Sequence, residues 1–62
     1  MEIVDLGIVV FQRRRGGDWF AEARMCVWDG AFQVTRFGWD RSLSSADAAR
    51  RYGWEQVTMR LL

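Results

Sequence analysis

Few side chains in this sequence are suited to acid–base, nucleophilic or metal chemistry. Histidine, the commonest general base and metal ligand, is absent. Cys26 is the single thiol, and Arg24 is the one basic residue predicted beside it, whereas a zinc site needs several ligands and a reactive thiol needs an activating neighbour. Four carboxylates that could meet in space belong to a type that usually faces solvent: Asp5, Glu22, Asp29 and Asp40. We therefore expect a protein that is not an enzyme and has no catalytic residue, metal site, cofactor or small-molecule substrate.

The size and composition favour one small globular domain spanning residues 1–62. Half of the 62 residues are hydrophobic, and four Trp and four Phe are many for so short a chain. Nine basic and eight acidic residues give a net charge of +1, which is too balanced for general polyanion binding. One cysteine excludes an internal disulfide, no secretory signal is recognisable, and the most apolar run, residues 3–11, is far shorter than the ~20 residues that span a membrane. We expect a protein that does not bind membranes and works in the cytoplasm of a bacterium or a phage-infected host cell, since Arg-only basic residues are typical of GC-rich coding.

In the stretch from Trp19 to Phe37, the character of the residues alternates from one position to the next on either side of Asp29-Gly30. Two such residues between alternating runs are typical of a two-residue hairpin turn, which needs positive φ angles. The register then follows by counting, with Trp28 opposite Ala31 and Val27 opposite Phe32. The face expected to form the core carries Trp19, Ala21, Ala23, Met25, Val27, Phe32 and Val34. The other face carries Phe20, Glu22, Arg24, Cys26, Trp28, Gln33, Thr35 and Phe37.

Two further segments complete the expected fold. Residues 2–13 form a predicted first strand whose core face carries Val4, Leu6, Ile8 and Val10. Ser44 is the predicted N-cap of a helix that runs to about Tyr52, and Gly53 favours a helix end and a final strand, although a continued helix stays open. We expect an α+β domain with an antiparallel three-stranded sheet, possibly a fourth strand at residues 54–61, and one helix packed on one face, in the order βββα(β).

The sheet face away from the helix is the predicted binding surface. Aromatic residues and Arg are enriched at interface hot spots because they bury a large area at low entropic cost. This register brings such residues together around Glu22, with Arg13 at the rim and Trp39 just beyond: Phe20, Arg24, Trp28 and Phe37. Alternatively, a second copy, the first strand or the connector 38–42 covers this face. The run Arg13-Arg14-Arg15 is either a solvated loop tip, which we favour, or a contact to phosphates.

Two segments resemble a known family. Phe20-Ala21-Glu22-Ala23-Arg24 and residues 44–52, SSADAARRY, look like the second strand and the helix of AP2-type DNA-binding domains, whose three-stranded sheet is related in shape to the arm-binding domain of phage integrases. The resemblance covers about half of the chain and implies DNA contact by Arg24 and Glu22 on the outer face, and by Arg13 or Arg14. The sequence departs from the family at Gly53, where the helix of that family continues, and in lacking a leucine-glycine pair ahead of the helix.

Three functions are compatible with these patterns. The first is a non-catalytic protein that docks its aromatic and Arg-bearing sheet face onto a protein or ribonucleoprotein partner, as phage or mobile-element modulators do, including inhibitors of host defence such as anti-CRISPR proteins. The second is DNA binding by the same face. The third is a structural homodimer joined through that face or through the edge of the third strand.

Overall fold

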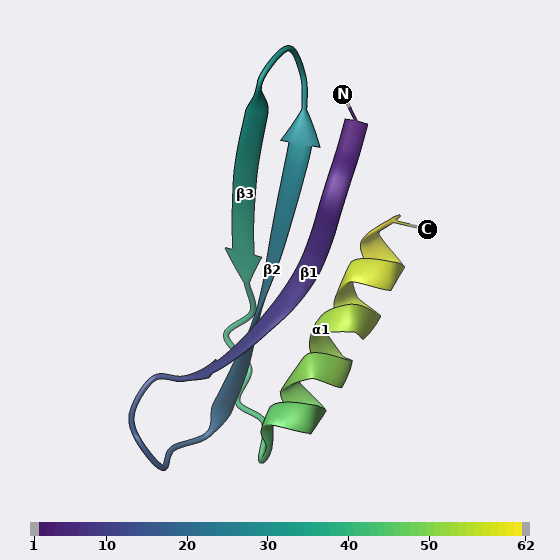
Figure 1. Ribbon diagram of the computed structural model, residues 1–62. Coiled ribbons are helices and arrows are strands. Elements are labelled where there is room, and N and C mark those ends of the chain that lie inside the picture. Colours follow the sequence, from purple (N-terminus) through teal and green to yellow (C-terminus); the bar gives the residue numbers. More distant parts are fainter. Residues whose placement is uncertain (1, 62) are drawn as a thin grey trace.

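Three antiparallel strands precede a single helix. The computed structural model describes residues 2–61, with β1 (Glu2–Gln12), β2 (Trp19–Trp28), β3 (Phe32–Gly38) and α1 (Ala46–Leu61). The strand order in the sheet is β1-β2-β3, and α1 packs across one face, against β1 and β2 (Figure 1). This arrangement confirms the predicted α+β fold in the order βββα. No helix within residues 2–61 has the length and hydropathy needed to cross a membrane.

Small side chains let α1 lie close to the sheet. Ala49, Gly53 and Val57 recur at every fourth position and are buried, which places them on one side of the helix. A Cβ atom added at Gly53 would lie 2.8 Å from Cγ2 of Ile8 and 3.2 Å from Cβ of Ala21. Only glycine therefore fits at this position without a shift of the sheet or the helix.

The prediction of a helix end at Gly53 and a strand at residues 54–61 is wrong. The helix continues through Gly53 to Leu61. An interior glycine costs a helix about 1 kcal/mol relative to Ala, but here the glycine permits the close contact with Ile8 and Ala21 that buries the helix. Tertiary packing thus overrides the local preference for a stop.

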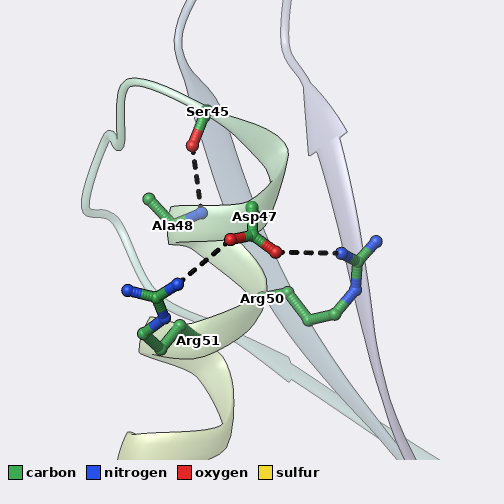
Figure 2. Close-up of polar contacts among 5 residues, drawn as sticks. All are labelled: Ser45, Asp47, Ala48, Arg50 and Arg51. Atoms are coloured by element: carbon green, nitrogen blue, oxygen red, sulfur yellow. Dashed lines mark hydrogen bonds and ion pairs between the residues drawn. The ribbon is translucent and has the colours of Figure 1, made fainter.

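The N-terminus of α1 is capped one residue later than expected. Oγ of Ser45, rather than Ser44, accepts a hydrogen bond from the N–H of Ala48 at 3.1 Å, as Figure 2 shows. The Asp47 carboxylate lies in the first turn and pairs with Arg51 at 3.1 Å and with Arg50 at 3.9 Å. These exposed ion pairs contribute little individually, while Asp47 also complements the positive end of the helix dipole.

The β2–β3 register differs from the prediction by one residue. The loop has three residues, 29–31, so that Trp28 pairs with Phe32 and Val27 with Gln33. Gly30 takes a φ of +76°, and the N–H of Asp29 donates to the carbonyl of Ala31 at 3.1 Å. A slip of one residue moves every side chain of a strand to the opposite face. The predicted faces are therefore correct for β2 and wrong for β3.

The first strand follows its predicted parity except at one end. Leu6, Ile8 and Val10 pair with the helix-side residues of β2, as expected. The register shifts between Ile3 and Asp5, which leaves Val4 in a bulge and brings Ile3 opposite Val27. The expectation that Val4 continues the core row is therefore wrong, and 47% of its surface is exposed.

Candidate functional site

The sheet face opposite α1, which we call the outer face, has no element of the described chain packed on it (Figure 1). Alternate residues of each strand point to it, because side chains alternate along a strand. The β2 residues on this side alternate with the buried row that contains Ala21, Ala23 and Val27, and strand pairing extends the assignment to β1 and β3. The outer face carries Glu2, Asp5, Gly7, Val9, Phe11, Phe20, Glu22, Arg24, Cys26, Trp28, Phe32, Val34 and Arg36.

One end of the outer face is strongly apolar. Trp28 and Phe32 are cross-strand partners with ring centroids 4.8 Å apart in an edge-to-face arrangement, and Val34 follows on the same side of β3. The exposed fractions are 43% for Trp28, 69% for Phe32 and 64% for Val34. We call these three residues the apolar end. Adjacent large apolar side chains that stay in contact with water mark an interaction site more often than scattered ones do.

Two arginines face each other at the centre of the outer face. Arg24 of β2 is the direct cross-strand partner of Arg36 of β3. Nε and Nη2 of Arg24 donate to Oε2 of Glu22 at 3.3 and 3.2 Å, which balances one of the two charges. Gly7 completes this row on β1, and a Cβ atom placed there would meet nothing within 4 Å. The centre is therefore a shallow, open strip with an excess positive charge.

The other end of the outer face holds a second aromatic pair. The rings of Phe11 and Phe20 are stacked with centroids 6.0 Å apart. The guanidinium of Arg13 lies 3.9 Å from the centroid of Phe20, and its Nη1 pairs with Oδ1 of Asp40 at 2.8 Å. Arg13 is thus held over the ring. Its loop neighbour Arg14 is exposed.

The structure brings together most of the predicted site residues. Four of them lie on the outer face, namely Phe20, Glu22, Arg24 and Trp28. Arg13 lies at the rim, and Arg14 belongs to the β1–β2 loop. These positions agree with the prediction, while their role in binding stays a prediction.

Phe37 and Trp39 do not belong to the outer face, so their predicted placement is wrong. Phe37 pairs with Ala23, which is buried beneath α1, and its ring lies 5.5 Å from that of Trp39. Trp39 in turn lies 6.1 Å from the ring of Tyr52 on the helix. These three aromatic rings form edge-to-face contacts on the helix side of the sheet.

The prediction missed three residues of the outer face: Phe32, Val34 and Arg36. The single cause is the three-residue loop, because the two-residue turn assigned these side chains to the core side. A signal was present in the sequence: three-residue hairpin loops that contain Gly are the next most common type, and Ala31 belongs to such a loop.

Cys26 lies on the outer face between its partners Asp5 and Val34 and is half-buried. Within residues 2–61 no group of three His, Cys, Asp or Glu side chains is close enough to hold a metal ion.

Comparison with known protein families, with curated proteins and with solved structures finds no match to this chain. The AP2-type resemblance accordingly agrees with the structure only at the level of architecture, a three-stranded antiparallel sheet followed by a C-terminal helix.

Proposed function

We propose that this chain is a non-catalytic binding domain that docks the outer face of its sheet onto a protein surface, either of a free protein or of a protein within a ribonucleoprotein. The observation that carries the proposal is the apolar end, where Trp28, Phe32 and Val34 lie side by side on two strands and stay exposed. Burying such side chains against a partner contributes a favourable free energy of about 25 cal/mol for each Å² of apolar area removed from water.

The charges of the outer face also favour a protein partner. Arg24 and Arg36 are offset by Glu22 and by Asp5, which the β1–β2 pairing places on the same side. A balanced face with aromatic residues and Arg has the composition of a protein interface, whereas phosphate recognition needs a clear excess of positive charge. We therefore expect binding that depends on the apolar end and changes little with salt.

A pair of matched tryptophans provides the test. Trp28 and Trp54 have almost equal exposure, 43% and 42%, but Trp54 lies on α1. Trp28→Ser is expected to weaken recovery of a specific protein from an extract of the source organism at least ~10-fold, as loss of an interface hot spot does. Trp54→Ser should leave that recovery unchanged, and the protein recovered should then bind the purified wild-type chain directly. Loss with Trp54→Ser but not with Trp28→Ser would place docking on the helix and contradict the proposal.

A second function, DNA binding by the outer face, is favoured by two observations. Arg24 and Arg36 oppose each other, and among the described residues Glu22 is the one carboxylate paired with either of them, which suits an anionic ligand. The helix also continues through Gly53, which removes one of the two departures from the AP2-type pattern. Nuclease treatment of the same extract separates the two functions. DNA binding predicts recovery that is lost with nuclease and falls steeply with salt, and protein docking predicts neither.

A further inference from the structure

The free edge of β3 is unprotected in a way that the other sheet edge is not. β3 has seven residues with no proline, no bulge in its pairing with β2 and one charge, Arg36. The edge formed by β1 is interrupted by the bulge at Val4 and carries Glu2 and Asp5. Bulges and charged residues are devices that prevent strand pairing between molecules. β3 lacks them.

The side chains of β3 are also poorly covered. Six of its seven residues are exposed, and only Phe37 is half-buried. The helix packs against β1 and β2 and does not reach across β3 (Figure 1). Within residues 2–61, β3 therefore pairs with a strand on one side only, and an additional strand would fit beside it in the plane of the sheet.

We propose that β3 pairs with β3 of a second copy of this chain, antiparallel and about a two-fold axis at Val34, to form a continuous six-stranded sheet. A two-fold pairing that keeps both outer faces on one side must set residues of equal parity opposite each other. With the axis at Val34, this residue lies opposite itself, and Phe32 lies opposite Arg36 of the second copy. The pairing goes beyond the proposed function, since it uses the strand edge and leaves the outer face open.

Charge selects this register over its neighbours. Moving the axis to Thr35 would set Arg36 opposite Val34 of the second copy and bring the two Arg36 side chains to diagonal positions, close to both Arg24 side chains. Moving it to Gln33 would set Arg36 opposite Gly30, beyond the end of the strand. The axis at Val34 separates the cations and places each guanidinium beside the ring of Phe32, a favourable cation–π geometry.

The expected affinity is modest. Pairing along one short strand edge buries less surface than the 1,200–2,000 Å² of a standard stable interface. We expect a dissociation constant on the order of 10–100 µM. Sedimentation of the wild-type chain at increasing concentration should show a monomer–dimer equilibrium, and a chain that stays monomeric up to about 1 mM would overturn the proposal.

Disulfide trapping tests the register. In a Cys26→Ser background, which removes the thiol opposite position 34 within the same chain, Val34→Cys would set two thiols face to face. Opposed residues of antiparallel strands have Cα atoms about 4.5–5.5 Å apart, within the range for a disulfide. Phe32→Cys in the same background is the control, because its copy would lie four residues away, about 13 Å along the strand.

Exposure makes this control stringent. Phe32 is more exposed than Val34, so random collisions would cross-link Phe32→Cys at least as fast. In a glutathione redox buffer we expect at least ten times more cross-linked dimer for Val34→Cys than for Phe32→Cys. Equal cross-linking, or more for Phe32→Cys, overturns the register.

A charge at the edge tests the interface without cysteines. Val34→Lys should weaken self-association at least ten-fold, because two ammonium groups would meet at the axis. Val4→Lys places the same charge at an exposed valine on the opposite edge of the sheet and should have no effect. An equal loss with Val4→Lys would assign the contact to β1 and contradict the proposal.

Discussion

Arg24 and Arg36 show how a single pair of side chains limits the stability of this sheet. Like charges directly opposite each other on neighbouring strands are destabilising, and Glu22 can balance one of them. The arrangement persists on a surface that the helix leaves open. Residues that reduce stability in this way often serve an interaction, which agrees with the proposed use of the outer face.

Replacing Arg36 should therefore stabilise the chain in a charge-dependent order. Arg36→Glu sets a carboxylate opposite Arg24 and is expected to raise the free energy of unfolding by roughly 0.2–1 kcal/mol, with Arg36→Gln in between. Urea denaturation at low salt measures the difference, and 1 M salt should nearly abolish it because screening then acts within about 3 Å. If Arg36→Glu is less stable than Arg36→Gln, repulsion between the two arginines is not the cause.

The helix and the sheet fit together through small residues, and this contact fixes both elements. Gly53 of α1 lies against Ala21 of β2, and Ala21, Ala23 and Ala49 are all buried, in agreement with the expected core face of β2. No large side chain within residues 2–60 is fully buried. A core this thin depends on close approach of the two backbones, since few large groups are available to fill a wider gap.

Gly53→Ala tests the close approach. Alanine would favour the helix by about 1 kcal/mol, but its Cβ would overlap Ile8 and press on Ala21, at an overpacking cost of about 1–3 kcal/mol. We expect a net loss of about 1 kcal/mol, seen as a fall in Tm of about 4–8 °C. Thr58→Ala, at an exposed position of the same helix, is the control and should be neutral or slightly stabilising. A Gly53→Ala chain more stable than the wild type would show that the helix can move away at little cost.

The elements were predictable from the sequence to different degrees. Alternation located the three strands and the β2 faces, because Ala21, Ala23, Met25 and Val27 occupy every second position. The hairpin register was not settled by Asp29-Gly30, since the same two residues suit loops of two or three residues. The end of the helix was missed because glycine was interpreted as a stop, whereas its spacing from Ala49 and Val57 marks a buried helical stripe.

The accuracy of the predicted site depended on how well these elements were predicted. Outer-face residues on β2 were found from parity alone, including Arg24 and Trp28. Those on β3 depended on the loop length, so Phe37 was assigned to the outer face in place of Phe32 and Val34. The contact of Trp39 with Tyr52 could not be foreseen, because it depends on how the connector returns to the helix.

The whole molecule is elongated, with extents of 41 × 24 × 16 Å. The β2–β3 hairpin extends beyond the C-terminal end of α1 (Figure 1), so one end of the sheet has no helix beside it. This end holds five of the exposed large hydrophobic residues: Ile3, Val4, Trp28, Phe32 and Val34. Stability is consequently concentrated in the part of the sheet that the helix covers. The proposed interaction surfaces are concentrated at the end that has no helix beside it.

Amide hydrogen exchange should report this division. At concentrations well below the dissociation constant of the dimer, amides of β2 near Ala21 and Ala23 are expected to exchange slowest among the strands, since α1 covers them, and those of β3 fastest. Well above that concentration, exchange in β3 should slow because its outward N–H groups gain partners, while β1 and α1 stay unchanged as internal controls. Slowing confined to β1, or spread evenly over the chain, would show that copies meet elsewhere. Concentration-independent exchange in β3 would show that its edge stays free and would overturn the proposed pairing, without affecting the proposal that the outer face docks onto a protein.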